Sequence, residues 1–164
     1  MSIFSFIKLA GESIFGGKNE EEELVAKKAA AEANELAEEA AMARRLEETI
    51  RDLSLDVEGL TVFVDDDRVS VSGEAHDQAT KEKVVLVLGN STGVASVEDN
   101  MTVEHTEPEA QFHTVVSGDS LSKIAKHYYG DPMKYTLIFE ANQPMLKDPN
   151  LIYPGQVLRI PRLD

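Results

Sequence analysis

Residues 60–72 have the sequence Leu-Thr-Val-Phe-Val-Asp-Asp-Asp-Arg-Val-Ser-Val-Ser, and the prediction of the fold starts from this stretch. Its apolar side chains recur with a period of two on both sides of the acidic run at 65–67. This period is typical of strands with one buried face, and a short polar segment between two such runs is typical of a hairpin turn. The stretch therefore predicts two antiparallel strands.

Helices are predicted on both sides of this hairpin. Residues 20–53 form a long Ala- and Glu-rich segment whose apolar positions recur every three or four residues, as expected of an amphipathic helix: Leu36, Ala40, Ala43, Leu46, Ile50 and Leu53. After the hairpin, Asp77 is the expected N-cap of a second helix, which buries Val84, Val85 and Leu88 and ends at Gly89-Asn90. A final strand follows at 94–103, with a potential break at Glu98-Asp99-Asn100. The predicted order is αββαβ.

A second, smaller unit is predicted after a polar, proline-containing linker at 105–111. A strand at 113–116 precedes a helix at 120–129, which Gly130 ends. Asp131-Pro132 then begins another helix, with an inner face formed by Met133, Leu137, Ile138 and Ala141. Pro154-Gly155 turns the chain into a last strand at 156–160. This βααβ unit makes the chain an α+β protein, with parts at 1–17, 18–104, 105–111 and 112–164.

The composition excludes several classes of function. The 164 residues carry 30 acidic and 16 basic side chains, a formal net charge of −14, which argues against binding to nucleic acid. No apolar run has the length of a membrane span, and the absence of cysteine excludes disulfides and thiolate metal sites. Because the first ten residues lack a basic leader, we expect a cytoplasmic protein. We also expect a monomer.

Residues 3–15 contain apolar side chains at helical spacing, ended by Gly16-Gly17. A short amphipathic helix here has two interpretations. It could cover the core of its own domain, or it could bind a membrane surface or a partner, although its few basic residues weaken the second interpretation.

No catalytic motif is present in the sequence. His76, His105, His113 and His127 lack the spacing of zinc-protease motifs, and no nucleophile elbow or phosphate-binding loop occurs. The run Asp65-Asp66-Asp67 lacks the glycine and terminal glutamate of a calcium loop, so we interpret it as a polar turn. We therefore expect no enzymatic activity.

Three ordered blocks in residues 112–161 resemble a LysM domain. They are FHTVVSGDSLSKIA from Phe112, IFEAN from Ile138 and IYPGQVLRIP from Ile152. Residues 43–104 resemble a BON domain, on the strength of VSVSG from Val69 and GVASV from Gly93. With the N-terminal pattern FxFxKxAGE from Phe4, the whole chain resembles the cytoplasmic bacterial potassium-binding proteins of BON–LysM architecture. The Ala/Glu-rich stretch at about 20–42 is longer than this resemblance leads us to expect.

This resemblance implies a potassium ion held by backbone carbonyl oxygens. The segments that it implicates lie near the N-terminus and after the second BON helix, and the carbonyls are those of Ile7, Ala10, Glu12, Gly89, Ser91 and Val94. Helix C-termini and glycine loops do expose carbonyls, and neutral oxygens suit potassium. Taken without the resemblance, 89–93 would be an ordinary turn. We expect the BON domain to bind K⁺ and closure of the LysM domain to report it.

The LysM resemblance also implies a shallow surface that binds N-acetylglucosamine glycans. The residues that we predict for it are Gly118, Asp119, Ser120, Leu121, Ile152 and Tyr153. In a cytoplasmic protein the same surface could instead dock the BON domain, or these residues could simply close the LysM fold. The alternative function is therefore an envelope protein that binds peptidoglycan, which export of the chain would support.

Overall fold

The computed structural model describes residues 20–163, which form parts of two compact units, 1–41 and 42–164. The helix predicted within 1–17 lies outside the described residues. Helix α2 (Glu20–Asp52) has four glutamates in its first turn, where negative side chains interact favourably with the positive end of the helix dipole and stabilise the helix. The prediction of this long helix is confirmed. In the described part of the chain, no helix has both the length and the apolarity needed to cross a membrane.

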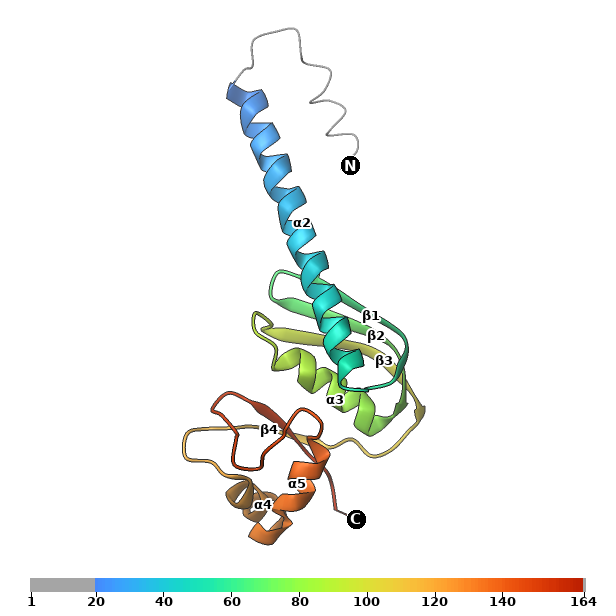
Figure 1. Ribbon diagram of the computed structural model, residues 1–164, viewed down its shortest axis with the longest axis vertical. Helices are drawn as coiled ribbons and strands as arrows, with labels where there is room; N and C mark the ends of the chain where they lie inside the picture. The colour runs from blue at the N-terminus through green and yellow to red at the C-terminus, as the bar shows by residue number, and fades with distance from the viewer. Residues whose placement is uncertain (1–19, 164) are drawn as a thin grey trace. The chain divides into compact units, whose positions relative to one another are not determined.

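Within 42–164, the residues up to 105, which include those that resemble a BON domain, are called the BON segment. This segment contains a three-stranded sheet in the order β1-β2-β3 (Figure 1). Strand β1 (Val57–Asp65) pairs antiparallel with β2 (Arg68–Asp77), and β2 pairs parallel with β3 (Ser96–His105). Helix α3 (Gln78–Gly89) makes the crossover that parallel strands require. The hairpin at 65–68, the N-cap at Asp77 and the α+β class are confirmed.

One core joins the end of α2, the sheet and α3. Ile50, Val69, Val84 and Leu88 are fully buried in it, and Val85 packs against it partly buried, so the predicted inner face of α3 is confirmed. Of the predicted stripe on α2, Leu46 and Ile50 are buried, whereas Leu36 remains 48% exposed. The apolar stripe therefore contributes to this core only near the C-terminal end of α2.

The expected break at 98–100 is wrong, because β3 is continuous from Ser96 to His105. Its polar side chains find partners there. Glu98 accepts a hydrogen bond from Ser70 Oγ at 3.3 Å, and Asp99 accepts one from the Met101 backbone N–H at 3.0 Å and lies 3.5 Å from Lys81 Nζ. Backbone pairing with β2 therefore outweighs the low strand propensity of these residues.

The residues from 111 to 163, which include those that resemble a LysM domain, are called the LysM segment. It has a two-stranded antiparallel sheet, β4 (Gln111–Thr114) with β5 (Val157–Ile160). Helix α4 (Leu121–Tyr129) has Ser120 as N-cap and Gly130 in the left-handed conformation as C-cap. A 3₁₀ turn, η1 (Pro132–Lys134), leads into α5 (Tyr135–Ala141). The core is formed by the buried residues Val115, Leu121, Ile124, Ala125, Ile138, Leu146, Leu158 and Ile160.

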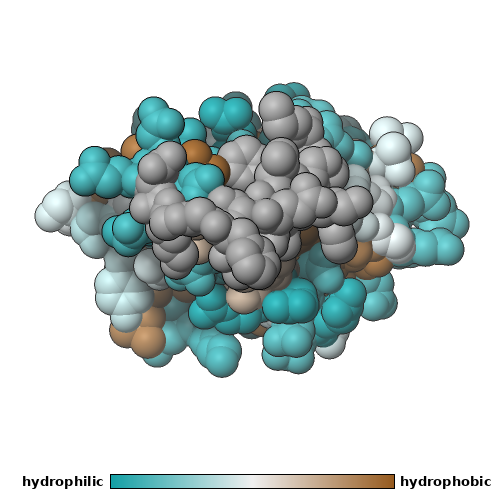
Figure 2. All heavy atoms as spheres, turned by 90° about the horizontal axis from the view of Figure 1, so that it is seen from above, coloured by the Kyte–Doolittle hydropathy of each residue, from teal (hydrophilic) through white to brown (hydrophobic). Residues whose placement is uncertain are grey.

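Met133 does not lie on the predicted inner face, since it is 71% exposed. The segment after Asp131 begins as a 3₁₀ turn with three residues per turn, so the helical phase used in the prediction does not extend back to Met133. Ile138, further along, is fully buried as expected. The face shown in Figure 2 is largely hydrophilic where its side chains are placed, with hydrophobic residues scattered, in keeping with the charged composition.

Candidate functional site

The end of α3 and the loop after it contain three of the six predicted carbonyls, those of Gly89, Ser91 and Val94. Ile7, Ala10 and Glu12 lie outside the described residues. The Asn90 N–H donates to the Leu86 carbonyl at 2.9 Å and caps the helix. Ser91 then donates twice, from its N–H to Leu88 O at 3.1 Å and from its hydroxyl to Val87 O at 2.6 Å. These bonds fix the direction in which the loop leaves the helix.

The second half of the loop is closed by its own backbone. Val94 N–H donates to Ser91 O at 3.2 Å, and Gly93 between them has a φ of 87°, a left-handed conformation that favours glycine. Ala95 N–H donates to Asp67 O at 2.7 Å, which joins the loop to the hairpin turn. A carbonyl oxygen has two lone pairs, so Ser91 O retains capacity for a cation. The partial negative charge at the C-terminus of α3 favours a cation at this position.

The same loop is bonded to the LysM segment through the Asn90 side chain. Its Nδ2 donates to Val157 O at 3.0 Å, and its Oδ1 accepts from Val157 N–H at 2.9 Å. The Asn90 side-chain amide therefore bonds to both backbone groups of Val157, the first residue of β5, as the backbone of a neighbouring strand would. These two bonds connect the loop at Asn90 directly to the LysM sheet.

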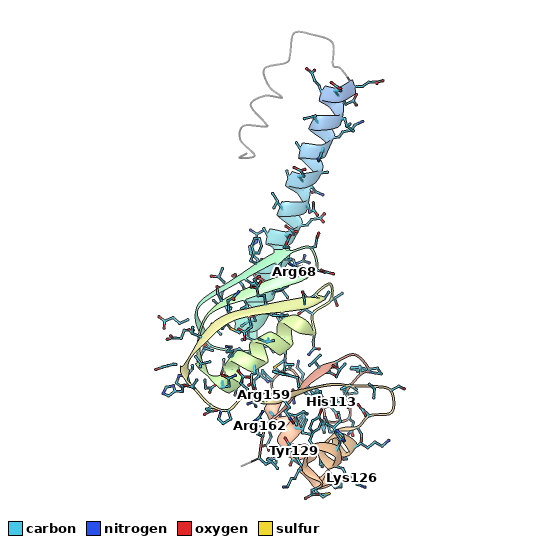
Figure 3. The ribbon with its side chains drawn as sticks, turned by 180° about the vertical axis from the view of Figure 1, so that it is seen from behind. Arg68, His113, Lys126, Tyr129, Arg159 and Arg162 are labelled. Atoms are coloured by element: carbon cyan, nitrogen blue, oxygen red, sulfur yellow. The ribbon has the colours of Figure 1, made fainter. Side chains whose placement is uncertain are left out.

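A second connection between the BON and LysM segments is centred on Glu82 of α3. Its side chain is only 5% exposed, and it forms an ion pair with Arg159 of β5, whose side chain is 12% exposed. The same carboxylate accepts hydrogen bonds from the Ala110 N–H and from Gln78 Nε2, each at 2.9 Å. Figure 3 labels Arg159 on the LysM side of this contact.

The surroundings of this ion pair are partly buried. Partial burial lowers the pKa of the Lys83 ammonium, and the nearby Arg159 guanidinium lowers it further. Arg159 is also held from the LysM side, because Asn142, only 2% exposed, accepts from the Arg159 N–H at 2.8 Å and donates to its carbonyl at 2.9 Å. Glu82, Arg159 and Asn142 therefore form a continuous polar network from α3 into the LysM core.

The predicted LysM surface consists of the start of α4 and the loop before β5. Its six residues differ in exposure. Leu121 is buried and Ile152 packs against the core, whereas Tyr153 is 62% exposed. The Val115 backbone N–H donates a hydrogen bond to Gln156 O, and Val115 O accepts one from the Gly155 N–H. The loop before α4 and the loop before β5 therefore lie side by side. The hydrogen bonds described above between the BON and LysM segments use Val157 and Arg159 instead, and a ligand-binding role for the six residues stays a prediction.

Asp119, in this surface, is held by the side chain of His113. His113 Nε2 lies 2.9 Å from Asp119 Oδ2, which also accepts from the Val116 N–H at 3.0 Å. The hydrogen bond from His113, followed by that from Val116, holds the pKa of the Asp119 carboxyl below its usual value. Ser120 caps α4, and Gly118 O accepts from Lys123 Nζ at 3.0 Å. These contacts give Gly118, Asp119 and Ser120 a structural role, whether or not they also bind a ligand.

The sequence patterns do not identify Asn90, Glu82 and Arg159 as the residues that connect the BON and LysM segments. The position of Asn90 in the sequence indicates only a helix stop, and its partner Val157 is 67 residues away. Glu82 did give a signal, since it lies within the helix that also buries Val84 and Leu88. A carboxylate buried in this way requires a partner, but the sequence does not identify Arg159, 77 residues further on.

Comparison with known proteins supports this organisation. Residues 38–105 match the BON domain family and residues 113–161 the LysM domain family. The chain is similar to the potassium binding protein Kbp of Escherichia coli O6:H1, with 36% identity over 165 residues, covering 98% of this chain and 99% of that protein. It also shares 59% identity over 49 residues with an uncharacterized protein of Deinococcus radiodurans, 30% of this chain and 19% of that protein.

A further match is to the esterase Rv1288 of Mycobacterium tuberculosis, with 45% identity over 53 residues. These residues make up 32% of this chain and 11% of the esterase, so the match concerns a short segment of a much larger enzyme. The relative that matches over its whole length is named as a binding protein.

Proposed function

The chain belongs to the family of the potassium binding protein Kbp, and on that premise we propose that it binds potassium ions through backbone carbonyls of its BON domain. The full-length identity to that binding protein is the observation on which the proposal depends. The loop from Gly89 to Val94 supports it, because carbonyls at a helix C-terminus are neutral oxygen ligands in a region of negative potential. The carbonyls of Ile7, Ala10 and Glu12 complete the proposed ligand set.

We infer that ion binding is transmitted to the LysM domain through Asn90. This residue lies between two of the proposed ligands, Gly89 and Ser91, and its side chain makes two hydrogen bonds to Val157. A cation that repositions the loop must therefore strain or reinforce these two bonds. The Glu82–Arg159 ion pair keeps the two domains in contact while this happens. The protein would act in the cytoplasm as a potassium sensor.

Tyrosine fluorescence tests the transmission step, because the chain has four tyrosines and no tryptophan, and all four (Tyr128, Tyr129, Tyr135 and Tyr153) lie in the LysM segment. Addition of KCl should change the tyrosine emission, and equimolar NaCl should not. In Asn90→Ala the emission change should shrink while calorimetry still detects potassium binding. A full emission change in Asn90→Ala would contradict a route through this side chain.

Deletion of residues 1–15 tests the ligand set. It removes three proposed carbonyls, so potassium binding should be abolished, while unchanged tyrosine emission confirms that the LysM domain remains folded. The matched control replaces Asp65, Asp66 and Asp67 with Asn, which should leave potassium affinity within about twofold because the proposed ligands are main-chain oxygens elsewhere. Normal potassium affinity in the deletion variant would show that the carbonyls of residues 1–15 are not ligands. A loss of potassium affinity of about tenfold in the triple Asn variant, equal to roughly 1.4 kcal/mol, would place the site at the hairpin turn.

The match to the LysM family favours a second candidate, binding of N-acetylglucosamine glycans. The exposed Tyr153 is the residue in the predicted surface best placed to stack on a sugar. Sedimentation with insoluble peptidoglycan should then retain the wild-type chain and release Tyr153→Ala. Absence of co-sedimentation by the wild-type chain would leave potassium binding as the proposed function.

A further inference from the structure

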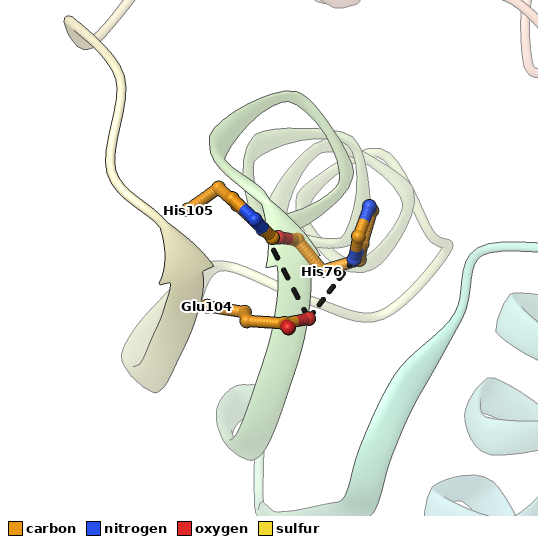
Figure 4. Close-up of side chains that lie close together, drawn as sticks. All are labelled: His76, Glu104 and His105. Carbon is orange, nitrogen blue, oxygen red and sulfur yellow. Dashed lines mark hydrogen bonds and ion pairs between the residues drawn. The ribbon is translucent and has the colours of Figure 1, made fainter.

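The ends of β2 and β3 bring together two histidines and a glutamate. The parallel register pairs Ala75 with Val103 and Asp77 with His105, which places His76 beside Glu104. The side chains of His76, Glu104 and His105 are 64%, 57% and 61% exposed, so solvent and ions reach all three. Figure 4 shows the two imidazoles on either side of the carboxylate.

The spacing of the three side chains suits a metal ion. His76 Nδ1 lies 3.0 Å and His105 Nδ1 3.9 Å from the same oxygen, Glu104 Oε2, and one ligand atom from each residue lies within 4.8 Å of the others. Nitrogen and oxygen ligands of tetrahedral zinc lie about 2.0–2.2 Å from the ion, hence about 3.3 Å from each other. The His76–Glu104 pair is already near that spacing. His105 Nδ1 lies 3.2 Å from the His76 carbonyl oxygen, so the exposed His105 ring must turn away from this contact to bring a nitrogen to the ion.

The surroundings favour a cation. A shallow cavity beside His76 is lined by seven residues, four of which carry carboxylates: Asp56, Glu58, Glu74 and Glu104. None of the seven is lysine or arginine. Such a cavity raises the local concentration of cations.

We propose that His76, Glu104 and His105 bind a divalent transition-metal ion of the Zn²⁺, Ni²⁺ or Cu²⁺ class. Imidazole nitrogen suits these ions, whereas potassium and magnesium prefer all-oxygen sites, so this site is independent of the proposed potassium site. Two imidazoles and one carboxylate leave a coordination position for water. The ion would bridge β2 to the last residues of β3 and stabilise the folded sheet.

Calorimetric titration of the full chain with ZnCl₂, in a constant background of KCl, tests the proposal. We expect one ion per chain in the wild type and a loss of affinity of at least about tenfold, or roughly 1.4 kcal/mol, in both His76→Ala and His105→Ala. His127→Ala is the matched control, because it removes an exposed histidine from α4, and it should bind zinc as the wild type does.

Two further measurements separate a built site from general surface binding. Zinc should raise the melting temperature of the wild type but not of His76→Ala, and nitrogen-detected NMR of the imidazoles should show zinc-dependent shifts at His76 and His105 only. Equal zinc affinity in the wild type and both histidine variants, an equal loss in His127→Ala, or no saturable binding to the wild type would each overturn the proposal. All three substitutions are at exposed positions, so the variants should fold, which circular dichroism verifies.

Discussion

Replacement of Glu82 by Ala should be among the most damaging substitutions in the chain. It removes the partner of Arg159 and leaves the Ala110 N–H without its carboxylate. With exposures of 5% and 12%, the two charged side chains are almost fully desolvated, and removal of one partner from a buried ion pair costs about 3–5 kcal/mol. The exposed pair of Lys27 with Glu23, at 73% and 56%, would by comparison contribute less than about 1 kcal/mol.

Urea denaturation measures this effect, with circular dichroism following the helices and tyrosine emission following the LysM domain. The tyrosine transition should move to a clearly lower urea concentration in Glu82→Ala. The double replacement of Glu82 and Arg159 by Met should recover part of the loss, because no unpaired charge is then buried, while the Ala110 N–H still lacks its acceptor. Glu48→Ala, which removes an exposed carboxylate, should change the free energy of unfolding by less than about 0.5 kcal/mol. A loss below about 1 kcal/mol in Glu82→Ala would refute the argument from burial.

Gly73→Ala should destabilise the BON domain more than Gly59→Ala in thermal denaturation, because an added Cβ would meet Val57 Cγ1 at 2.7 Å at position 73 and nothing within 4 Å at position 59. Asn142→Ala should cost about 2–4 kcal/mol in the tyrosine-monitored transition, since it leaves buried backbone groups without their partners. The lowered pKa of Asp119 contributes stability that is present above the unfolded pKa and lost as pH falls through the lower, folded value. Acidification below about pH 4 should therefore destabilise the wild type more than Asp119→Asn in the same assay.

The features of the fold that are local in sequence could be predicted. The caps Asp77 and Gly130 act within one turn of their own helices, and the hairpin at 65–68 is set by neighbouring residues. The error at Met133 comes from a local change to a 3₁₀ turn. The other error occurred where partners distant in sequence decide the outcome. Strand β3 stays continuous across Glu98 to Asn100 because β2 and Lys81 supply its partners.

The candidate site was less accessible to prediction for a physical reason. Backbone carbonyls are the same in every residue, so their role at Gly89, Ser91 and Val94 came from the resemblance to a family and not from side-chain chemistry. The connection between the domains was not predicted either. Asn90 with Val157, and Glu82 with Arg159, are pairs separated by more than sixty residues, and only the folded chain brings them together.

Selective binding of potassium by this chain can be measured by calorimetric titration of the full chain with KCl and, separately, with NaCl at matched ionic strength. We expect a saturable isotherm with KCl at one ion per chain and no saturable heat with equimolar NaCl. Indistinguishable isotherms for the two salts, or no saturable binding of potassium, would contradict selective binding.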